Sequence, residues 1–419
     1  MTLPSAQNIT RVVLDNGITI LVYENFAAES VIISGSLQVG SAYEPAHKIG
    51  LSAMTAVALM RGTRTRDFTT IHEALEDVGA DISVGGGWYR TNISGKSLAE
   101  DLPNVLDVLA DVLRNPTFPE THIDRLRGET LTSLQIRSQD TRYRAGRAFY
   151  ETLYPEGHPY HAPTRGTLES VPTLTALDLT AFHKGHYGGK NMIIVVVGAI
   201  KAADAVELIR ARFGDWNNPD QPDQIAPADV APITESKRTV ITLPGKSQAD
   251  IVLGTLGPSR HAPDFTAAQL ANSVLGQFGM MGRIGKSVRE QGGLAYYAYS
   301  QVEGGLAPLP WHVVAGVNPE NIDLAIQKIT DEVRRMTEEA VSEDDLADNQ
   351  AYFTGHLPLQ LESNEGIGDT LHNMELYGRG LDYLVNYRDM IYSVTRDDIL
   401  ATARHYLNAD RLVMGIATP

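Results

Sequence analysis

The stretch Gly50–Thr63 reads GLSAMTAVALMRGT and is the most informative part of the chain. Its apolar and small residues follow a helical pattern that stops at Gly62, as expected where glycine ends a helix. Between Glu44 and Asp67 there is no acidic residue, and the only histidine is His47. Taken alone, the stretch therefore predicts a buried helix of small residues with no group for acid–base or metal chemistry.

The length of the chain indicates two domains. Its 419 residues are too many for one ordinary hydrophobic core and suit two domains of about 200 residues each. A segment rich in Pro, Asp and Asn, Asp215–Pro232, lies near the midpoint and has no apolar period, which is typical of a linker. We expect an N-terminal domain at residues 1–215, a linker at 216–232 and a C-terminal domain at 233–419.

The two halves show the same order of predicted elements, which indicates an internal duplication. Each half opens with strand-like runs and continues into a long amphipathic helix pattern. The runs are Arg11–Leu14, Ile18–Tyr23 and Val31–Val39 in the first half, and Thr239–Thr242 and Ile251–Leu256 in the second; the helix patterns are Ala99–Arg114 and Glu320–Met336.

The ends of the two halves also match. Asp178 is followed nine residues later by Tyr187, and Asp397, 219 residues after Asp178, is followed nine residues later by Tyr406. A β-like run follows each. We therefore predict an α+β fold of two similar domains related by duplication, each a mostly antiparallel sheet with helices packed on one face.

Composition and charge exclude several classes of function. The net charge of −16 argues against nucleic-acid binding, which needs a basic face, and is compatible with a basic or extended peptide ligand. The absence of cysteine excludes disulfides and cysteine-ligated zinc. No apolar run approaches the roughly 18 residues that span a bilayer, and Met1–Thr10 has no secretory pattern. We expect a cytoplasmic protein without a membrane span.

The frame of Gly50–Thr63 resembles the zinc helix of the pitrilysin/insulinase metallopeptidases, especially the branch that includes the mitochondrial processing peptidase. Active members carry Gly-Leu-Ala-His-x-x-Glu-His-x-x-x-x-Gly-Thr, in which the two His bind one zinc ion and the Glu is the general base. Here Ala53 and Val57 occupy the His positions, and Ala56 occupies the Glu position.

The third zinc ligand is also missing. In the family it is a Glu about 76 residues after the second His, a position that holds Ser133 in this chain. The nearest carboxylate, Glu129, is about one helical turn away. Because catalytic zinc normally takes three N, S or O ligands from the protein, the resemblance implies a zinc-less member that does not cleave peptides alone.

Further short motifs occur in the order that the family shows, so the resemblance covers nearly the whole chain. They are Leu14–Thr19, Val39–Glu44, His158–Tyr160, Arg165–Thr167 and Asn191–Gly198.

A second-half segment, Ser287–Ser300, resembles the family segment in which an Arg, and a Tyr seven residues later, line the substrate cleft. Arg289 and Tyr296 match that pair. An Arg suits a peptide carbonyl or carboxylate, and a Tyr hydroxyl can donate to a developing oxyanion. The alternative is that Tyr296 is an ordinary strand residue and Arg289 a surface charge at a helix end.

The resemblance implies a non-catalytic, substrate-binding or regulatory subunit of a heteromeric zinc metalloendopeptidase. A homologous His-x-x-Glu-His partner subunit would carry the zinc, this chain would hold no cofactor or metal, and Arg289 and Tyr296 would act in trans on a peptide substrate. The alternatives are a structural scaffold like the core proteins of respiratory complexes, and an independent enzyme with another site, which no motif supports. A homodimer is possible for the chain in isolation. The pair His183 and His186 is expected to be structural, because no third ligand is evident.

Overall fold

The computed structural model describes residues 2–226, 228–278 and 281–419. The chain forms two compact units, each assembled from three separate segments. Unit 1 comprises Met1–Ser133, Pro163–Ala226 and Leu357–Asn386, and unit 2 comprises Leu134–Ala162, Pro227–His356 and Tyr387–Pro419. The linker lies between the part of the sequence that forms most of unit 1 and the part that forms most of unit 2. Each unit also contains one segment from the other half of the sequence, and the predicted boundaries at 215 and 233 assign that segment to the wrong unit.

Unit 1 is built on a six-stranded sheet with strand order β1-β2-β6-β3-β5-β4. The β2–β6 pair is parallel and the other pairs are antiparallel. The central strands β3 and β6 are buried along almost their whole length, and β6 is almost entirely apolar, whereas β5 alternates buried and exposed residues, as expected near a sheet edge with one covered face. The strands are β1 (Ile9–Val13), β2 (Thr19–Glu24), β3 (Ser30–Leu37), β4 (Asp81–Gly86), β5 (Thr91–Leu98) and β6 (Ile193–Gly198).

Unit 2 is built on a five-stranded sheet with strand order β7-β11-β8-β10-β9. The β7–β11 pair is parallel and the rest are antiparallel. The strands are β7 (Lys237–Thr242), β8 (Ala249–Leu256), β9 (Ala295–Gly304), β10 (Pro308–Val317) and β11 (Val413–Thr418).

The two sheets have the same topology. If β1 is set aside, each sheet places its first strand beside its last, then its second, fourth and third, so that β6 and β11 are equivalent. The predicted α+β class, the mostly antiparallel sheets and the duplication are confirmed.

The last helix of each half begins with a capping box, and the two boxes align the halves one residue away from the alignment that the sequence pattern indicated. Helix α6 (Ala176–His186) begins with a box of Thr175 and Asp178, and α13 (Arg396–Tyr406) begins with a box of Thr395 and Asp398. The counterpart of Asp178 is therefore Asp398 and not Asp397. The pairing of Asp178 with Asp397 was wrong because two adjacent aspartates occupy the first turn of α13, and only the second caps it.

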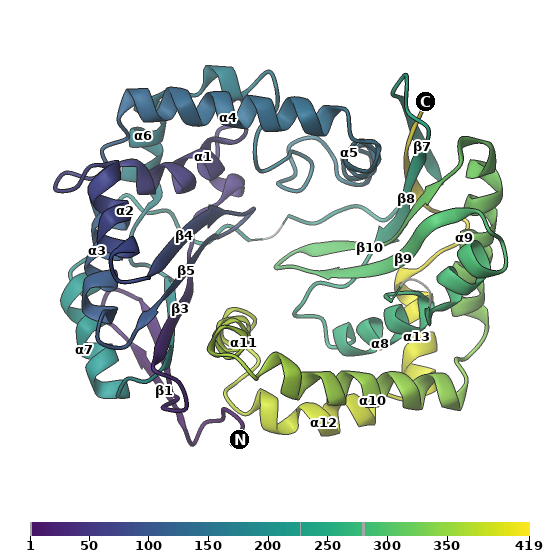
Figure 1. Cartoon of the computed structure of the whole chain (residues 1–419). Helices are drawn as coiled ribbons and strands as arrows, with labels where there is room; N and C mark the ends of the chain where they lie inside the picture. The colour runs from purple at the N-terminus through teal and green to yellow at the C-terminus, as the bar shows by residue number, and fades with distance from the viewer. Residues whose placement is uncertain (1, 227, 279–280) are drawn as a thin grey trace. The chain divides into compact units, whose positions relative to one another are not determined.

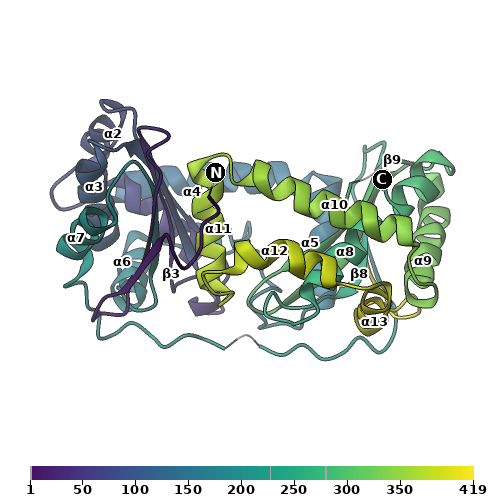
Figure 2. The same ribbon diagram turned by 90° about the horizontal axis from the view of Figure 1, so that it is seen from below.

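Helices cover one face of the unit 1 sheet, and a helix from the second half of the sequence packs on the other (Figures 1 and 2). Helix α11 (Asn364–Leu376) buries Ile367, Leu371 and Met374 against Ile32, Val195 and neighbouring strand residues. The helices on the opposite face include α2 (Phe68–Glu76), α3 (Leu102–Arg114) and α7 (Ala202–Phe213).

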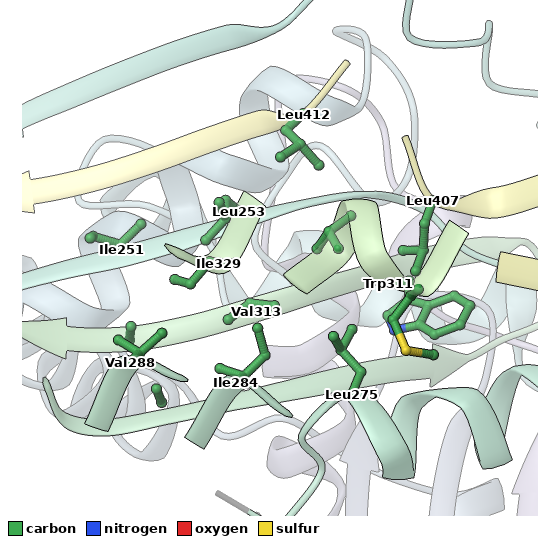
Figure 3. Packing of buried hydrophobic residues seen from close by; sticks show 14 of the residues in the cluster. Ile251, Leu253, Leu275, Ile284, Val288, Trp311, Val313, Ile329, Leu407 and Leu412 are labelled. Atoms are coloured by element: carbon green, nitrogen blue, oxygen red, sulfur yellow. The ribbon is translucent and has the colours of Figure 1, made fainter. Parts of the chain in front are cut away.

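Unit 2 shows the reciprocal arrangement. Helix α5 (Thr141–Leu153), from the first half of the sequence, packs so closely on β11 that a Cβ atom on Gly415 would lie 2.2 Å from the carbonyl oxygen of Ala145. The main core lies between this sheet and α8 (Phe265–Leu275), α9 (Ile322–Glu338) and α13, and it includes Trp311 and Val313 of β10 and Ile329 of α9 (Figure 3).

Three further helices contain or adjoin the boundary between the units: α4 (Glu120–Ser138), α10 (Glu343–Gln360) and α12 (Tyr383–Ser393). Helix α1 (Leu51–Ala58) continues into the 3-10 turn η2 (Leu59–Arg61), and a π-helical turn, η5, spans Gly285–Glu290. Within the residues described, none of the helices has the length and apolar character that crossing a membrane requires.

Candidate functional site

Helix α1, in unit 1, begins beside the half-buried carboxyl group of Glu44. Gly50 is the N-cap with φ 96°, and Glu44 accepts hydrogen bonds from the backbone N–H groups of Gly50 (2.9 Å) and Ser52 (2.7 Å). These bonds satisfy two N–H groups that a helix start leaves without partners. Burial raises the pKa of Glu44 to about 8, although both backbone bonds oppose the rise.

The three residues at the family's catalytic positions lie on α1 as the motif predicts, but they are packed as ordinary side chains. Ala56 is fully buried, Ala53 is half-buried and Val57 is 44% exposed. The end of β4 lies directly on this helix, because a Cβ atom on Gly86 would come within 2.8 Å of the Ala53 Cα. The helix thus supports the edge strand of the sheet.

The residues present do not fit zinc. Ala53, Ala56 and Val57 offer only methyl carbons, and Ser133 offers one hydroxyl on α4. Glu129, one turn earlier on α4, forms ion pairs with Arg125 (2.8 Å) and Arg61 (3.9 Å). Across the described parts of the chain, no group of three His, Cys, Asp or Glu side chains could hold a metal ion.

The Gly-Thr end of the motif has a structural role. The Thr63 hydroxyl donates to Asp111 Oδ2 at 2.6 Å, and Thr65 and Arg66 bond the same oxygen at 2.7 Å each. Although burial opposes it, these bonds lower the pKa of Asp111, so that the carboxylate stays ionised and fixes the turn after α1. The retained part of the motif therefore maintains the fold.

A polar groove of about 420 Å³ lies on the unit 1 sheet between α11 and the edge strands. Gly85 and Gly86 of β4 form one side, and Asp369 and His372 of α11 form the other. The rest of the lining consists of Ser34, Gly35, Ser83, Asn92, Ile93 and Ser94. Because these side chains are small, the groove exposes backbone and hydroxyl groups rather than deep side-chain pockets.

A buried network holds α11 in place beside the groove. Arg90 Nε donates to Ser36 Oγ at 2.6 Å, and Ser36 Oγ lies 2.7 Å from His372 Nε2. Burial, together with the nearby charge of Arg90, lowers the pKa of His372 to about 4, so that its ring is neutral near pH 7. The hydrogen bond between Ser36 Oγ and His372 Nε2 ties the second-half helix to β3.

In unit 2, Arg289 lies at the end of η5, which the core anchors. Ile284 and Val288 are fully buried in the cluster shown in Figure 3, whereas Arg289 is exposed. The turn that follows is closed by hydrogen bonds from Gly293 N to Arg289 O and from Leu294 N to Val288 O, each 3.0 Å. π-Helical turns occur frequently at functional sites.

Tyr296 lies at the start of the edge strand β9, after the turn that follows Arg289. Its side chain is 74% exposed. Its neighbours have partners: the Tyr297 hydroxyl donates to Asp250, and the Arg142 guanidinium lies over the rings of Tyr297 and Tyr299. Alternation along the strand directs Tyr296 to the other face. The structure therefore places Arg289 and Tyr296 at the two ends of one short, fixed connection, and both are exposed.

Several residues around these sites were not predicted from the sequence. Asp369 and His372 come from the other half of the chain, and Arg142 reaches β9 from the first half. No short-range pattern marks them, since their role depends on the exchange of segments between the units. His183 was correctly expected to be structural: its Nε2 lies 2.8 Å from the Leu113 carbonyl oxygen, and its ring stacks on Tyr187.

The two duplicated sheets and the zinc helix without ligands define a peptidase-like protein of two domains that lacks the metal site. Two family models match the chain: "Insulinase (Peptidase family M16)" over residues 20–162 and "Peptidase M16 inactive domain" over residues 173–352. The chain belongs to the M16 peptidase family, and its recognition as a pitrilysin/insulinase homologue is confirmed.

Relatives and solved structures agree. An uncharacterised zinc protease of Streptomyces coelicolor is 26% identical over 406 residues, which is 95% of this chain and 87% of that protein. Cytochrome b-c1 complex subunit 1 of Rattus norvegicus is 24% identical over 64% of this chain and 55% of its own length. A crystal structure described as a peptidase M16 inactive domain, from Pseudomonas fluorescens, has a TM-score of 0.91 and 25% identity over 98% of each chain.

Proposed function

We propose that this chain is the non-catalytic, substrate-binding or regulatory subunit of a heteromeric zinc metalloendopeptidase. A homologous partner subunit with a His-x-x-Glu-His helix would hold the zinc and the general base. This chain would supply Arg289 and Tyr296 to the peptide chamber and would need no cofactor of its own. We expect the pair to act in the cytoplasm, and a homodimer of the isolated chain would not be the working assembly.

The proposal rests on the short connection from Arg289 to Tyr296. Two side chains suited to a peptide carbonyl or an oxyanion are exposed on a turn that the core of unit 2 fixes. Residues that are exposed but held on a rigid scaffold are typical of binding sites. Neither side chain belongs to the buried core of this unit, which favours a role toward a ligand.

The polar groove of unit 1 is a second reason to propose a peptide ligand. It borders β4, the edge strand of its sheet, whose outer backbone groups are available for pairing with an extended segment. Small lining residues favour recognition of the peptide backbone over one particular side chain.

The test mixes the purified chain with its zinc-bearing partner and follows cleavage of a quenched fluorescent peptide. We expect cleavage only in the mixture, and a loss of about tenfold or more in kcat/KM with Arg289→Ala or Tyr296→Phe, because removing one oxyanion donor costs about 10²–10³ in rate. Arg334→Ala and Tyr392→Phe are the matched controls, since both side chains lie at the surface of unit 2 away from the turn.

A scaffold function is the second candidate, and the similarity to a cytochrome b-c1 subunit favours it. Full activity of the partner alone, unchanged by this chain, would sink the trans-acting role and leave the scaffold function.

A further inference from the structure

A cavity of about 920 Å³ lies within unit 2, between η5, α9 and the start of α10. It is separate from the polar groove of unit 1, and its volume is in the range of small-ligand sites. Four basic and four acidic side chains line it, so its lining is charged but close to neutral overall.

Two of the four basic side chains already have partners. Arg335 forms ion pairs with Glu332 (3.1 Å) and Glu339 (3.2 Å) on its own helix. Arg396 donates to the Val341 carbonyl oxygen and lies 3.6 Å from Glu343. Arg335 and Arg396 both line the cavity, and neighbouring carboxylates balance their positive charges.

Arg283 is different. Its Nη1 atom is buried and has no hydrogen-bond partner among the residues that the structure describes. Burial lowers the pKa of Arg283 and repulsion from Arg335 acts in the same direction, whereas the negative charges of Asp345, Glu332 and Glu339 oppose the fall. The carboxylates of Glu332 and Glu339, which would otherwise pair with it, are engaged by Arg335. Nearby carboxylates thus balance part of the charge, but a buried N–H donor without an acceptor still costs free energy until an acceptor, such as the oxygen of an incoming carboxylate, meets it.

We propose that this cavity binds the free carboxylate of a short peptide, with Arg283 as the group that pairs with it. Lys286 lines the same cavity and adds a second positive charge, which strengthens the attraction for a carboxylate. Glu290 and Asp345 also line it and suit the ammonium end of a zwitterion. These two carboxylates disfavour a multiply charged anion such as phosphate.

The choice of a peptide rests on the proposed function, because short peptides with free carboxylates are the products of the proposed complex. Binding itself does not depend on it, since the cavity lies in one unit of this chain. Lys286, Ser287 and Glu290 belong both to the cavity lining and to η5, the turn that carries Arg289. A bound product would therefore be coupled to Arg289 through a single π-helical turn.

The experiment titrates triglycine into the full-length chain alone and measures heat by calorimetry. Triglycine amide, which lacks the carboxylate, and inorganic phosphate are titrated in parallel. The variant is Arg283→Gln, and the control is Arg334→Gln, an arginine of α9 that pairs with Asp410 (2.8 Å) and does not line the cavity. The melting temperature of Arg283→Gln is measured as well and is expected not to fall, since the buried Nη1 atom that the variant removes makes no hydrogen bond among the described residues.

We expect triglycine to bind, the amide to bind at least tenfold more weakly, and Arg283→Gln to weaken triglycine at least tenfold while the control leaves it unchanged. The proposal is overturned if triglycine does not bind, if the amide binds equally well, or if Arg283→Gln has no effect. Phosphate binding as tight as triglycine binding would overturn the peptide assignment. Because the partner is absent, none of these outcomes bears on cleavage by the complex.

Discussion

The segments Gly50–Thr63 and Arg289–Tyr296 keep different parts of what a peptidase needs. In the first, the helix, its N-terminal cap and its Gly-Thr end are kept, while the ligand positions hold Ala53, Ala56 and Val57. In the second, the potential ligand-contacting groups are kept and exposed. The difference teaches that a motif can be retained for two separable reasons, one being packing and the other chemistry.

Packing explains why the first segment keeps its frame without zinc. Glu44 satisfies the helix start, Asp111 fixes the turn after it, and Gly86 of the edge strand lies against Ala53. Each contact would be lost if the helix changed its position. The frame is therefore required by the sheet, whether or not a metal is present.

The largest effect is expected from placing a methyl group between β4 and α1. In Gly86→Ala the new Cβ would lie 2.8 Å from the Ala53 Cα, and because both atoms are fixed by backbone, we expect the free energy of unfolding to fall by about 1–3 kcal/mol. Gly85→Ala is the matched control, since a Cβ there meets nothing within 4 Å. Urea denaturation of both variants tests this, and equal stabilities would show that the helix does not support the strand.

The second effect is a dependence of stability on pH that arises from Glu44. Its carboxyl has a pKa of about 8 in the folded protein against 4.5 for an exposed glutamate, so the native state binds the proton more tightly. Stability from this group is present below about pH 4.5 and is lost as the pH rises toward 8. Between pH 6 and 7 the slope for one group is at most about 1.4 kcal/mol per pH unit.

The measurement compares the free energy of unfolding of the wild type and Glu44→Gln at pH 6 and pH 7. We expect the wild type to lose up to about 1 kcal/mol more than the variant over this interval. The comparison with the variant is needed because buried histidines such as His183, whose pKa burial lowers, change stability in the opposite direction over the same range. Identical slopes would mean that Glu44 is ionised throughout and caps α1 as a carboxylate.

Much of this could be predicted from the sequence, and the failures have one physical cause. The α+β class, the duplication and the location of the degenerate helix follow from local periodicity and from the order of motifs, which depend on residues close in sequence. The exchange of α5 and α11 between the units does not, because an amphipathic helix shows that it has a partner but not which sheet it covers. Asp369 and His372 were missed for that reason. The one-residue error at α13 arose because Asp397 and Asp398 are adjacent and only geometry distinguishes the capping residue.

The smallest effect is expected where the comparison matters most, at Arg289 and Tyr296. Both side chains are exposed, and no hydrogen bond, ion pair or ring contact of either is found among the described residues. Replacing Arg289 by Ala or Tyr296 by Phe should therefore change the free energy of unfolding by no more than about 0.5 kcal/mol, the usual range for surface positions. Tyr297→Phe is the matched contrast, because it removes a hydroxyl that donates to the buried Asp250 and should cost about 1–3 kcal/mol. If Tyr296→Phe destabilised the chain as much as Tyr297→Phe, the tyrosine would be explained by packing, and its retention would no longer support a role toward a peptide.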